Sequence, residues 1–299
     1  MKTSIIIPSR NEPYLVKTVN NILITATGDI EIIIMLDGKP WETELSYDRR
    51  ITILRSEKPM GRRKATNSAV GVARGEYLMK CDAHCSFAEG FDEVLKADCA
   101  DNWIVIPRRY ELDAPSWTIP DQEPEEAMFY IYPWGDPDRI RFACRPWRKR
   151  ALERKEISID EDMGFQGSTW FMTRSHWDRL GKMNEKGYGS FVSEPEEIGL
   201  KTWLGPWDGA VMRNKKTWYA HWSKPQTHWH AVKGKLGWIP EKEWWDGWAY
   251  CADYWMRNRW PERAHDIEWL IEKFWPLPNW PEDWIESKAV FADMLQKET

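Results

Sequence analysis

The sequence predicts an α/β fold, in which a sheet is flanked by helices and a tryptophan-rich helical extension follows. The sheet is predicted by short β-branched runs that each end in polar residues, with segments of helical spacing between them. The extension is predicted by the distribution of tryptophan, since 15 of the 22 tryptophans come after residue 200. We therefore expect one α/β domain in residues 1–230 and a helical, tryptophan-rich extension in residues 231–299.

Composition excludes some classes of function. The 299-residue chain has a formal net charge of -5 and a pI near 5.8, so it has no global attraction to nucleic acid or to an anionic membrane. Five scattered cysteines and the lack of a hydrophobic signal segment before residue 4 indicate a reduced, cytoplasmic protein. The longest apolar runs, residues 4–8 and 30–36, are much shorter than the roughly 20 residues of a membrane span, so none is predicted.

The first predicted unit is a strand, a helix and a strand. Residues 4–8 form a β-branched run that stops at proline, residues 16–24 have helical spacing, and residues 31–36 form a second buried strand. In open parallel sheets, ligands bind outside the carboxyl ends of the strands. The polar residues found there are candidate nucleotide contacts: Asn11, Glu12 and Asp37. The alternative is that they only cap helices and turns.

A third strand is predicted at residues 51–54, and Gly61 then precedes a helix that begins with three consecutive cations. Arg62, Arg63 and Lys64 oppose the helix dipole at that end, which is tolerable if they face an anion such as a diphosphate. The alternative is a solvated basic turn. This sequence feature alone does not choose between the two.

A candidate metal site follows the fourth predicted strand, which begins at residue 77. Asp82 and His84 are separated by one residue where the strand ends, so both side chains can point to the same side of a turn. One hard oxygen and one borderline nitrogen suit Mn²⁺ or Mg²⁺ bound together with an anionic substrate. A solvated carboxylate beside an ordinary histidine is the alternative.

Several of these motifs, taken in order, resemble a known family. The segments SIIIPSRNEP, EIIIMLDG and GRRKATNSAVGVARGEYLMKCDAHC resemble the nucleotide-binding half of GT-A fold glycosyltransferases of the family 2 kind. The form Asp-Ala-His-Cys is similar to the metal motif of polypeptide N-acetylgalactosaminyltransferases in particular. The resemblance implies a GT-A fold, that is, a Rossmann-like mixed sheet flanked by helices.

The resemblance continues downstream, with departures. Residues 166–172 match a strand under the donor sugar, although the double glycine of the family appears here as Gly167 and a serine. Residues 191–198 match a Trp-Gly-Gly-Glu-Asn-x-Glu-Ile run, with Phe191 in place of the tryptophan. Residues 219–224 match the region of the third metal ligand, with Lys224 in place of an arginine. Lys64 also replaces an arginine, and the lectin module usual in the family has no counterpart.

The resemblance implies roles for individual residues. The implied metal ligands, for Mn²⁺ or Mg²⁺, are Asp82, His84 and His221, with His228 and His230 as competitors of His221. Glu194 would bind sugar hydroxyls or accept the acceptor proton, and Glu197 would orient the site. Two solvated carboxylates at a helix start are the alternative for this pair. The implied donor-binding residues are Pro8, Arg10, Asn11, Glu12, Asp37, Gly61, Lys64, Asp82, Gly167, Phe191 and Lys224.

Two regions have a less specific signal. Residues 139–155 interleave basic and aromatic side chains, which is typical of a polyanion site, a solvated helical face or a loop that closes over the diphosphate. In the C-terminal part, Trp244, Trp248, Cys251 and Trp255 recur at helical spacing. We expect most of these tryptophans to pack in helices, while some are able to stack on a sugar or a base.

These observations lead to one main hypothesis and two alternatives. The main hypothesis is a metal-dependent enzyme that moves a hexose or N-acetylhexosamine from a UDP-sugar to a hydroxyl of a peptide or glycan, with retention implied by the resemblance. The first alternative is the same enzyme acting on hydroxymethylated bases of DNA. The second is a non-catalytic carbohydrate-binding protein on the same fold, against which Asp82, His84 and His221 argue.

Overall fold

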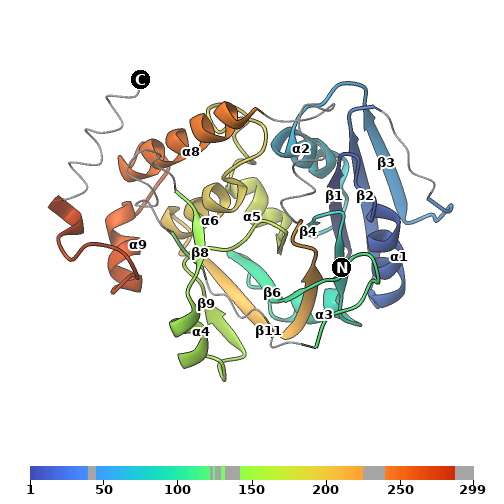
Figure 1. The fold of residues 1–299 in the computed structure, drawn as a ribbon, viewed down its shortest axis with the longest axis horizontal. Coiled ribbons are helices and arrows are strands. Elements are labelled where there is room, and N and C mark those ends of the chain that lie inside the picture. Colours follow the sequence, from blue (N-terminus) through green and yellow to red (C-terminus); the bar gives the residue numbers. More distant parts are fainter. Residues whose placement is uncertain (40–44, 122–123, 125–128, 132–141, 225–239, 287–299) are drawn as a thin grey trace.

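The computed structural model describes residues 1–299 except 40–44, 122–123, 125–128, 132–141, 225–239 and 287–299 (Figure 1). Its elements, in chain order, are β1 (Thr3–Ser9), α1 (Leu15–Thr25), β2 (Ile30–Asp37), β3 (Ile51–Ser56), α2 (Arg62–Val72), β4 (Tyr77–Cys81), β5 (Cys85–Phe87), α3 (Phe91–Ala97), β6 (Trp103–Glu111), β7 (Phe129–Ile131), β8 (Cys144–Pro146), α4 (Arg148–Glu153), β9 (Ile159–Glu161), β10 (Thr169–Thr173), α5 (Arg174–Arg179), α6 (Glu194–Leu204), β11 (Ala210–His221), α8 (Glu241–Met256) and α9 (Ile267–Phe274).

The main sheet is mixed and has nine strands within the described residues. Its order is β3-β2-β1-β4-β10-β6-β11-β5, with β9 paired to β11, and a separate pair contains β7 and β8. The strands and helices predicted between residues 4 and 79 are all present, so the predicted α/β fold with a mixed sheet is confirmed. The β-branched runs form the central strands because both of their faces are covered.

Strand directions place the carboxyl ends of most strands at one edge of the sheet. β1 runs parallel to β2 and β4, whereas β10 is antiparallel to both β4 and β6. β6 is therefore parallel to β4, and β11 is parallel to β6. The carboxyl ends of β1, β2, β4 and β11 consequently meet at the same edge, where ligands bind in sheets of this kind.

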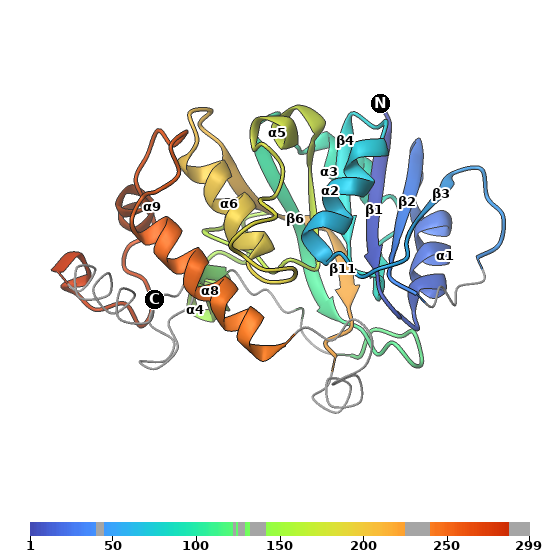
Figure 2. The same cartoon turned by 90° about the horizontal axis from the view of Figure 1, so that it is seen from above.

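Alternate side chains of the strands enter different hydrophobic clusters on the two faces of the sheet. In β1, Ile5 and Ile7 pack with residues of α1 and α3, while Ile6 packs with residues of α2. This alternation follows from the two-residue period of a strand. Figure 2 shows the sheet from above, with α2, α5 and α6 beside it. Both faces of the sheet are therefore covered by packed side chains.

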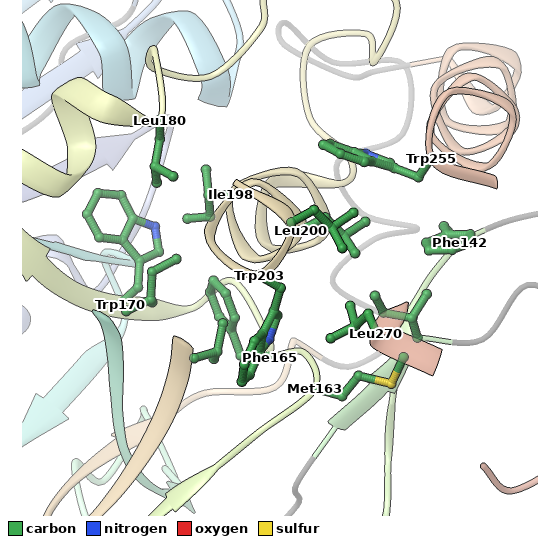
Figure 3. Packing of buried hydrophobic residues seen from close by; sticks show 14 of the residues in the cluster. Phe142, Met163, Phe165, Trp170, Leu180, Ile198, Leu200, Trp203, Trp255 and Leu270 are labelled. Atoms are coloured by element: carbon green, nitrogen blue, oxygen red, sulfur yellow. The ribbon is translucent and has the colours of Figure 1, made fainter. Parts of the chain in front are cut away.

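The C-terminal helices share the hydrophobic cluster of α6. In Figure 3, Leu200 and Trp203 of α6 lie between Trp170 of the sheet and the residues Trp255 and Leu270 of α8 and α9. The tryptophans Trp255, Trp260, Trp280 and Trp284 are buried, which agrees with the packing role expected for most of them. The predicted division between residues 230 and 231 lies outside the described residues and stays a prediction. None of the described helices has the length and apolar character of a membrane span.

Candidate active site

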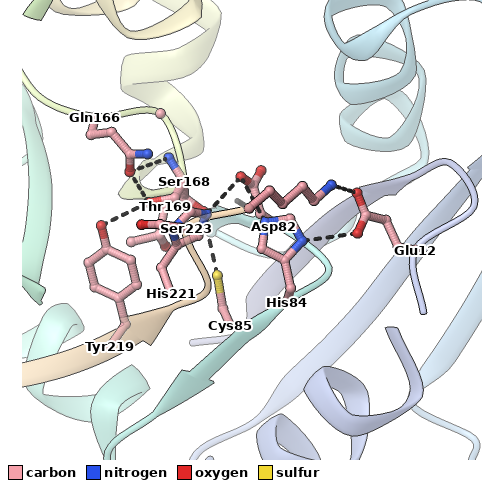
Figure 4. Close-up of polar contacts among 12 residues, drawn as sticks. Glu12, Asp82, His84, Cys85, Gln166, Ser168, Thr169, Tyr219, His221 and Ser223 are labelled. Carbon is pink, nitrogen blue, oxygen red and sulfur yellow. Dashed lines mark hydrogen bonds and ion pairs between the residues drawn. The ribbon is translucent and has the colours of Figure 1, made fainter. Parts of the chain in front are cut away.

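Three predicted metal ligands meet at the carboxyl edge of the sheet. Asp82 and His84 follow β4, and His221 ends β11, where it opposes Cys85 of β5. Oδ2 of Asp82 lies 3.4 Å from Nε2 of His221 and 3.9 Å from Nε2 of His84. The three ligand atoms all lie within 4.8 Å of one another, so the sheet assembles one site from two distant segments (Figure 4).

The donor atoms of this cluster fit a divalent cation. Nε2 of His221 is buried and, among the described residues, has no hydrogen-bond partner. Burial lowers the pKa of His221 to about 3 against the opposing effect of Asp82, so the neutral ring has a lone pair to offer. Burial alone would raise the pKa of Asp82, but Lys80 and Arg62 bring it well below its usual range. One ionised oxygen and two imidazole nitrogens suit Mn²⁺ or Mg²⁺.

Glu12 orients one of the ligands from the loop after β1. Its Oε2 lies 3.1 Å from Nδ1 of His84, and its Oε1 pairs with the ammonium group of Lys224. Burial raises the pKa of Glu12, but His84 and Lys224 outweigh it and lower the pKa to about 2, so the carboxylate is ionised. A carboxylate that accepts from one ring nitrogen fixes the tautomer and directs the other nitrogen to a metal. Lys224, predicted to contact phosphate, is here held by Glu12.

A second polar group lies behind His221. Nη2 of Arg109 is 3.5 Å from Nδ1 of His221 and donates to Oγ of Ser223 at 2.8 Å. Glu111 completes this group, because it accepts from both the backbone and the hydroxyl of Ser223. No role was predicted for Arg109 from the sequence. The signal that the sequence offered was a cation among the residues of a strand.

The predicted nucleotide contacts lie at the ends of β1 and β2. Oδ1 of Asp37 accepts from the backbone of Met60 at 2.6 Å, and its Oδ2 accepts from Gly61 at 3.0 Å. Arg10 also pairs with Asp37, and Asn11 has a left-handed backbone with φ of 51°. Asp37 therefore organises the loop before α2. Pro8, another predicted donor contact, is inside β1 and opposite Met35.

Gly61 occupies a position that excludes a side chain. Its φ is +89°, and a Cβ atom there would lie 2.4 Å from Cβ of Ser190 and 2.7 Å from its carbonyl oxygen. Only glycine combines this backbone with such a close approach. The start of α2 is thereby packed directly against the segment that leads into α6.

The three consecutive cations at the start of α2 have different surroundings. Lys64, the predicted donor contact, is exposed, whereas Arg63 is buried and pairs with Glu197. Arg62 is half-buried: its Nη1 lies 3.6 Å from Oε2 of Glu194, and its guanidinium covers the ring of Phe191 at 4.1 Å. Among the three, Arg62 is the cation next to Glu194, the predicted catalytic carboxylate. The sequence motifs did not distinguish Arg62 from its two neighbours.

Glu194 begins α6 and is completely buried. Its Oε1 accepts from Nε1 of Trp170 at 2.8 Å, and its Oε2 lies 3.5 Å from Nζ of Lys80. A Cβ atom on Gly167 would lie 3.8 Å from Oε2 of Glu194, so the predicted floor of the donor site is close to this carboxylate. The preceding Ser193 has φ of 57°, a left-handed conformation that turns the chain into the helix.

Glu197 lies one turn further along α6. It pairs with Arg63 and with Lys201, the latter at 2.8 Å, and it accepts from the backbone of Asn184 at 2.8 Å. Its side chain is 1% exposed. The alternative of two solvated carboxylates at a helix start is therefore wrong for both Glu194 and Glu197. The contacts of Glu197 are those of a residue that joins α2 to α6.

Aromatic rings continue outward from Phe191. The ring of Phe191 stacks on Trp244 of α8 with a centroid distance of 5.8 Å, and Trp244 contacts Trp248 edge to face at 6.2 Å. The C-terminal extension thus borders the predicted donor site. His228 and His230, the competing metal ligands, lie outside the described residues.

Comparisons with known proteins show the family and the fold. Residues 4–179 match the family model described as glycosyl transferase family 2. A glycosyltransferase named GlyG from Streptococcus pneumoniae is 24% identical over 174 residues, which cover 56% of this chain and 50% of that protein. Polypeptide N-acetylgalactosaminyltransferase 5 from Caenorhabditis elegans is 25% identical over 220 residues, which cover 68% of this chain and 34% of that protein. The chain thus spans half or less of the length of these curated relatives.

Solved structures share the fold. A crystal structure of GalNAc-T7 with UDP, GalNAc and Mn²⁺ matches 91% of this chain and 56% of that chain, with a TM-score of 0.61 and 15% identity. A structure of residues 1–349 of TarS from S. aureus, in complex with UDP-GlcNAc, matches 85% of this chain and 67% of that chain, with a TM-score of 0.52 and 12% identity. These matches confirm the GT-A fold that the sequence motifs implied.

Proposed function

The chain belongs to glycosyl transferase family 2, and from that premise we propose that it moves a hexose or N-acetylhexosamine from a UDP-sugar to a hydroxyl group. We infer further that the reaction depends on Mn²⁺ or Mg²⁺ and retains the anomeric configuration. UDP and UDP-GlcNAc in the crystal structures of GalNAc-T7 and TarS support the choice of nucleotide for this chain. Retention rests on the likeness to polypeptide N-acetylgalactosaminyltransferases.

The cluster of Asp82, His84 and His221 is the observation that carries this proposal. Its three ligand atoms converge within 4.8 Å at the strand ends, where an anionic donor would bind. A divalent cation held by these residues would supply the positive charge that stabilises a departing diphosphate. Glu12 and Arg109 hold the two histidine rings from behind, so the ligands need little rearrangement.

The donor would lie along the strand ends. The uracil would contact Asn11 and Asp37, close to the tight turn at Gly61, and the diphosphate would lie against the metal cluster and Lys224. The sugar would then lie over Gly167, between Glu194 and Phe191. Because Glu194 is completely buried and held by Trp170, we assign it to orienting the sugar side of the site rather than to taking the acceptor proton.

A donor-hydrolysis screen tests the proposal. The protein is incubated with a panel of nucleotide sugars and Mn²⁺, and release of the nucleoside diphosphate is measured, since slow hydrolysis needs no acceptor. We expect one UDP-sugar to be hydrolysed, with loss of activity in EDTA, recovery on adding Mn²⁺, and no activity in Asp82→Asn. Asp178→Asn, which changes an exposed carboxylate of α5, is the matched control and should retain activity. Hydrolysis that survives EDTA, or equal hydrolysis of GDP-sugars, would contradict the proposal.

A further inference from the structure

Lys80 is a buried cation in the middle of the sheet. It belongs to β4, pairs through its backbone with Ile6 on one side and Trp170 on the other, and is 0% exposed. The neighbouring positions Leu78 and Met79 are apolar and equally buried. An ammonium group in such a place is costly unless it is paired, and a break in an apolar strand pattern often marks a functional site.

The ammonium group of Lys80 has three oxygen neighbours from three segments. Its Nζ lies 2.8 Å from Oδ1 of Asp82, 2.5 Å from the carbonyl oxygen of Gly167 and 3.5 Å from Oε2 of Glu194. Two of its three donors bond to Asp82 and Gly167, and Glu194 lies within ion-pair distance. Lys80 therefore joins the end of β4, the loop before β10 and the start of α6.

This arrangement determines which oxygen of Asp82 faces the histidines. Oδ1 is held by Lys80, while Oδ2 faces Nε2 of His221 at 3.4 Å and Nε2 of His84 at 3.9 Å. A carboxylate fixed in this way offers a single oxygen to a cation. The position of the metal-binding oxygen thus depends on a residue that is not itself a ligand.

Glu194 depends on the same cation. Its Oε1 is held by Trp170, but its Oε2 has no hydrogen-bond partner among the described residues and is completely buried. The nearest cations to Oε2 are Lys80 and Arg62, at 3.5 and 3.6 Å. Since Lys80 has no exposed surface, it cannot contact a bound sugar donor directly and acts through the carboxylates of Asp82 and Glu194.

We propose that Lys80 is a positioning residue that links the metal-binding carboxylate Asp82 to Glu194 and sets the geometry of both. The inference deepens the proposed function and rests on it, because the metal cluster is what Lys80 would position. Charge alone has the opposite effect: a cation this close to a metal site repels a divalent ion, so its removal would tighten binding. The sign of the change in metal affinity therefore separates positioning from simple repulsion.

The test is the affinity for Mn²⁺ alone, measured by electron paramagnetic resonance without any nucleotide. We expect Lys80→Met to raise the Kd for Mn²⁺ by about 10-fold or more, as for other residues that orient metal ligands. The matched control is Lys201→Met, which removes another buried lysine paired with a carboxylate of α6, at 2.8 Å from Glu197. It should lower thermal stability and leave the Kd for Mn²⁺ unchanged.

A second comparison keeps the test valid if Lys80→Met does not fold. Lys80→Met combined with Glu194→Gln removes both buried charges, and its Kd is compared with that of Glu194→Gln alone. Positioning predicts weaker Mn²⁺ binding in the double variant, although it has one cation fewer beside the metal. Equal or tighter binding than in the reference protein, in either comparison, would overturn the inference.

The same measurements separate this inference from the proposed function. If the unmodified protein binds no Mn²⁺, the metal-dependent function fails and Lys80 has no metal ligand to position, so the inference fails with it. If the unmodified protein binds Mn²⁺ and Lys80→Met binds it equally well, only the inference fails. For the UDP-sugar found in the hydrolysis screen, we expect Lys80→Met to lower kcat by about 10- to 100-fold. A change confined to thermal stability would indicate a purely structural pair.

Discussion

Two carboxylates lie next to His84, the proposed metal ligand. Asp82 lies beside its Nε2, and Glu12 accepts from its Nδ1 while also pairing with Lys224. This arrangement is typical of metal sites in which a second carboxylate holds the ring and raises its basicity. The ring orientation is thus built into the loop after β1, before any metal or donor binds.

The role of Glu12 leads to a prediction. Glu12→Gln keeps the shape of the side chain but removes the charge that faces Nδ1, so we expect the Kd for Mn²⁺ to rise by about 10-fold. Isothermal titration calorimetry with Mn²⁺ would measure this change. Glu57→Gln is the control, because Glu57 is a surface carboxylate paired with Lys39. Unchanged affinity in Glu12→Gln would show that His84 needs no orienting partner.

At the residue scale, the sequence identified the proposed metal ligands, which the structure brings together, but not the residues that hold them. Asp82 and His84 were found from their spacing at a strand end, and His221 from the ordered resemblance downstream. Lys80 was missed because the run YLMKC reads as a buried strand, in which one lysine is easily taken as a strand end. A cation in an apolar strand was the available signal, but two of its three partners, Gly167 and Glu194, are far away in the sequence.

The start of α6 concentrates acidic groups at the element scale. Glu194, Glu196 and Glu197 all lie in its first turn, where the helix dipole favours negative charge. Two of them have cations nearby, whereas Glu196 is buried and accepts from the backbone of Cys144. Burial raises the pKa of Glu196 from 4.5 to about 7, against the effect of these hydrogen bonds. Between pH 4.5 and about 7, Glu196 is therefore protonated in the folded protein and ionised in the unfolded chain.

This raised pKa predicts how stability depends on pH. Between the unfolded pKa of 4.5 and the folded pKa of about 7, the native state binds more protons, so its stability falls as the pH rises through this range. Above pH ~7, the shift in the pKa of Glu196 lowers the free energy of unfolding by roughly 3 kcal/mol. Glu196→Gln should therefore be more stable than the unmodified protein at pH ~8, with a much smaller difference at pH ~5.

Urea unfolding at the two pH values measures the effect of Glu196→Gln. The exposed carboxylate of Glu156, near Lys155, gives the control variant Glu156→Gln, which should change the free energy of unfolding equally at both. If the difference in the free energy of unfolding between Glu196→Gln and the unmodified protein were the same at both pH values, the pKa of Glu196 would not be raised by folding.

The described part of the basic segment of residues 139–155 contains strand β8 and the short helix α4. Arg148 and Lys149 of α4 are exposed, and α4 lies beside β8 and β9 (Figure 1). Arg150 instead covers the rings of Trp147 and Phe274, and Arg154 pairs with Asp160. Arg150 and Arg154 therefore contribute to packing and ion pairing. Fewer of the basic side chains in the described part of this segment are exposed than the sequence suggested. The role of the segment in binding a polyanion or closing over the diphosphate stays a prediction.

A double variant decides between these roles. We expect Arg148→Ala combined with Lys149→Ala to leave UDP binding, donor hydrolysis and DNA binding unchanged, since the net charge of -5 gives no long-range attraction to DNA. Filter binding of DNA at several salt concentrations checks this. If modified DNA is the acceptor, the variant should instead flatten the log-log salt dependence by about 0.9 for each phosphate that is no longer neutralised. Weaker UDP binding would favour the closing loop.

Element boundaries show where sequence reasoning was less accurate. The strand expected from residue 166 begins at Thr169, because Ser168 hydrogen-bonds back to the side chain of Gln166 and the backbone of Asp82 donates to Ser168. The start of β10 is therefore set partly by a tertiary contact with the end of β4, which local propensity does not contain.

At the scale of the whole molecule, the sequence predicted a helical extension in residues 231–299, and the described part of it shares a hydrophobic cluster with α6. Trp255 of α8 donates to the hydroxyl of Tyr188 at 3.0 Å and contacts Trp260, while Trp203 of α6 packs against Phe274 of α9. Tryptophan-rich composition predicted helices and packing correctly. It did not predict their partners, because a helical spacing of apolar residues does not identify the surface that they cover.

The shared core predicts one cooperative unfolding transition, which calorimetry and near-ultraviolet circular dichroism should report at the same temperature. Trp255 is 1% exposed, so Trp255→Ala leaves a large cavity and should lower the free energy of unfolding by about 3–5 kcal/mol. Trp269→Ala is the control, since Trp269 is 37% exposed, and it should change stability by about 0.5 kcal/mol or less. Two separate transitions, with Trp255→Ala affecting only one, would instead support an independent unit beginning near residue 231. In that case the helices α8 and α9 would contribute little to holding Glu194 and the site at the start of α6.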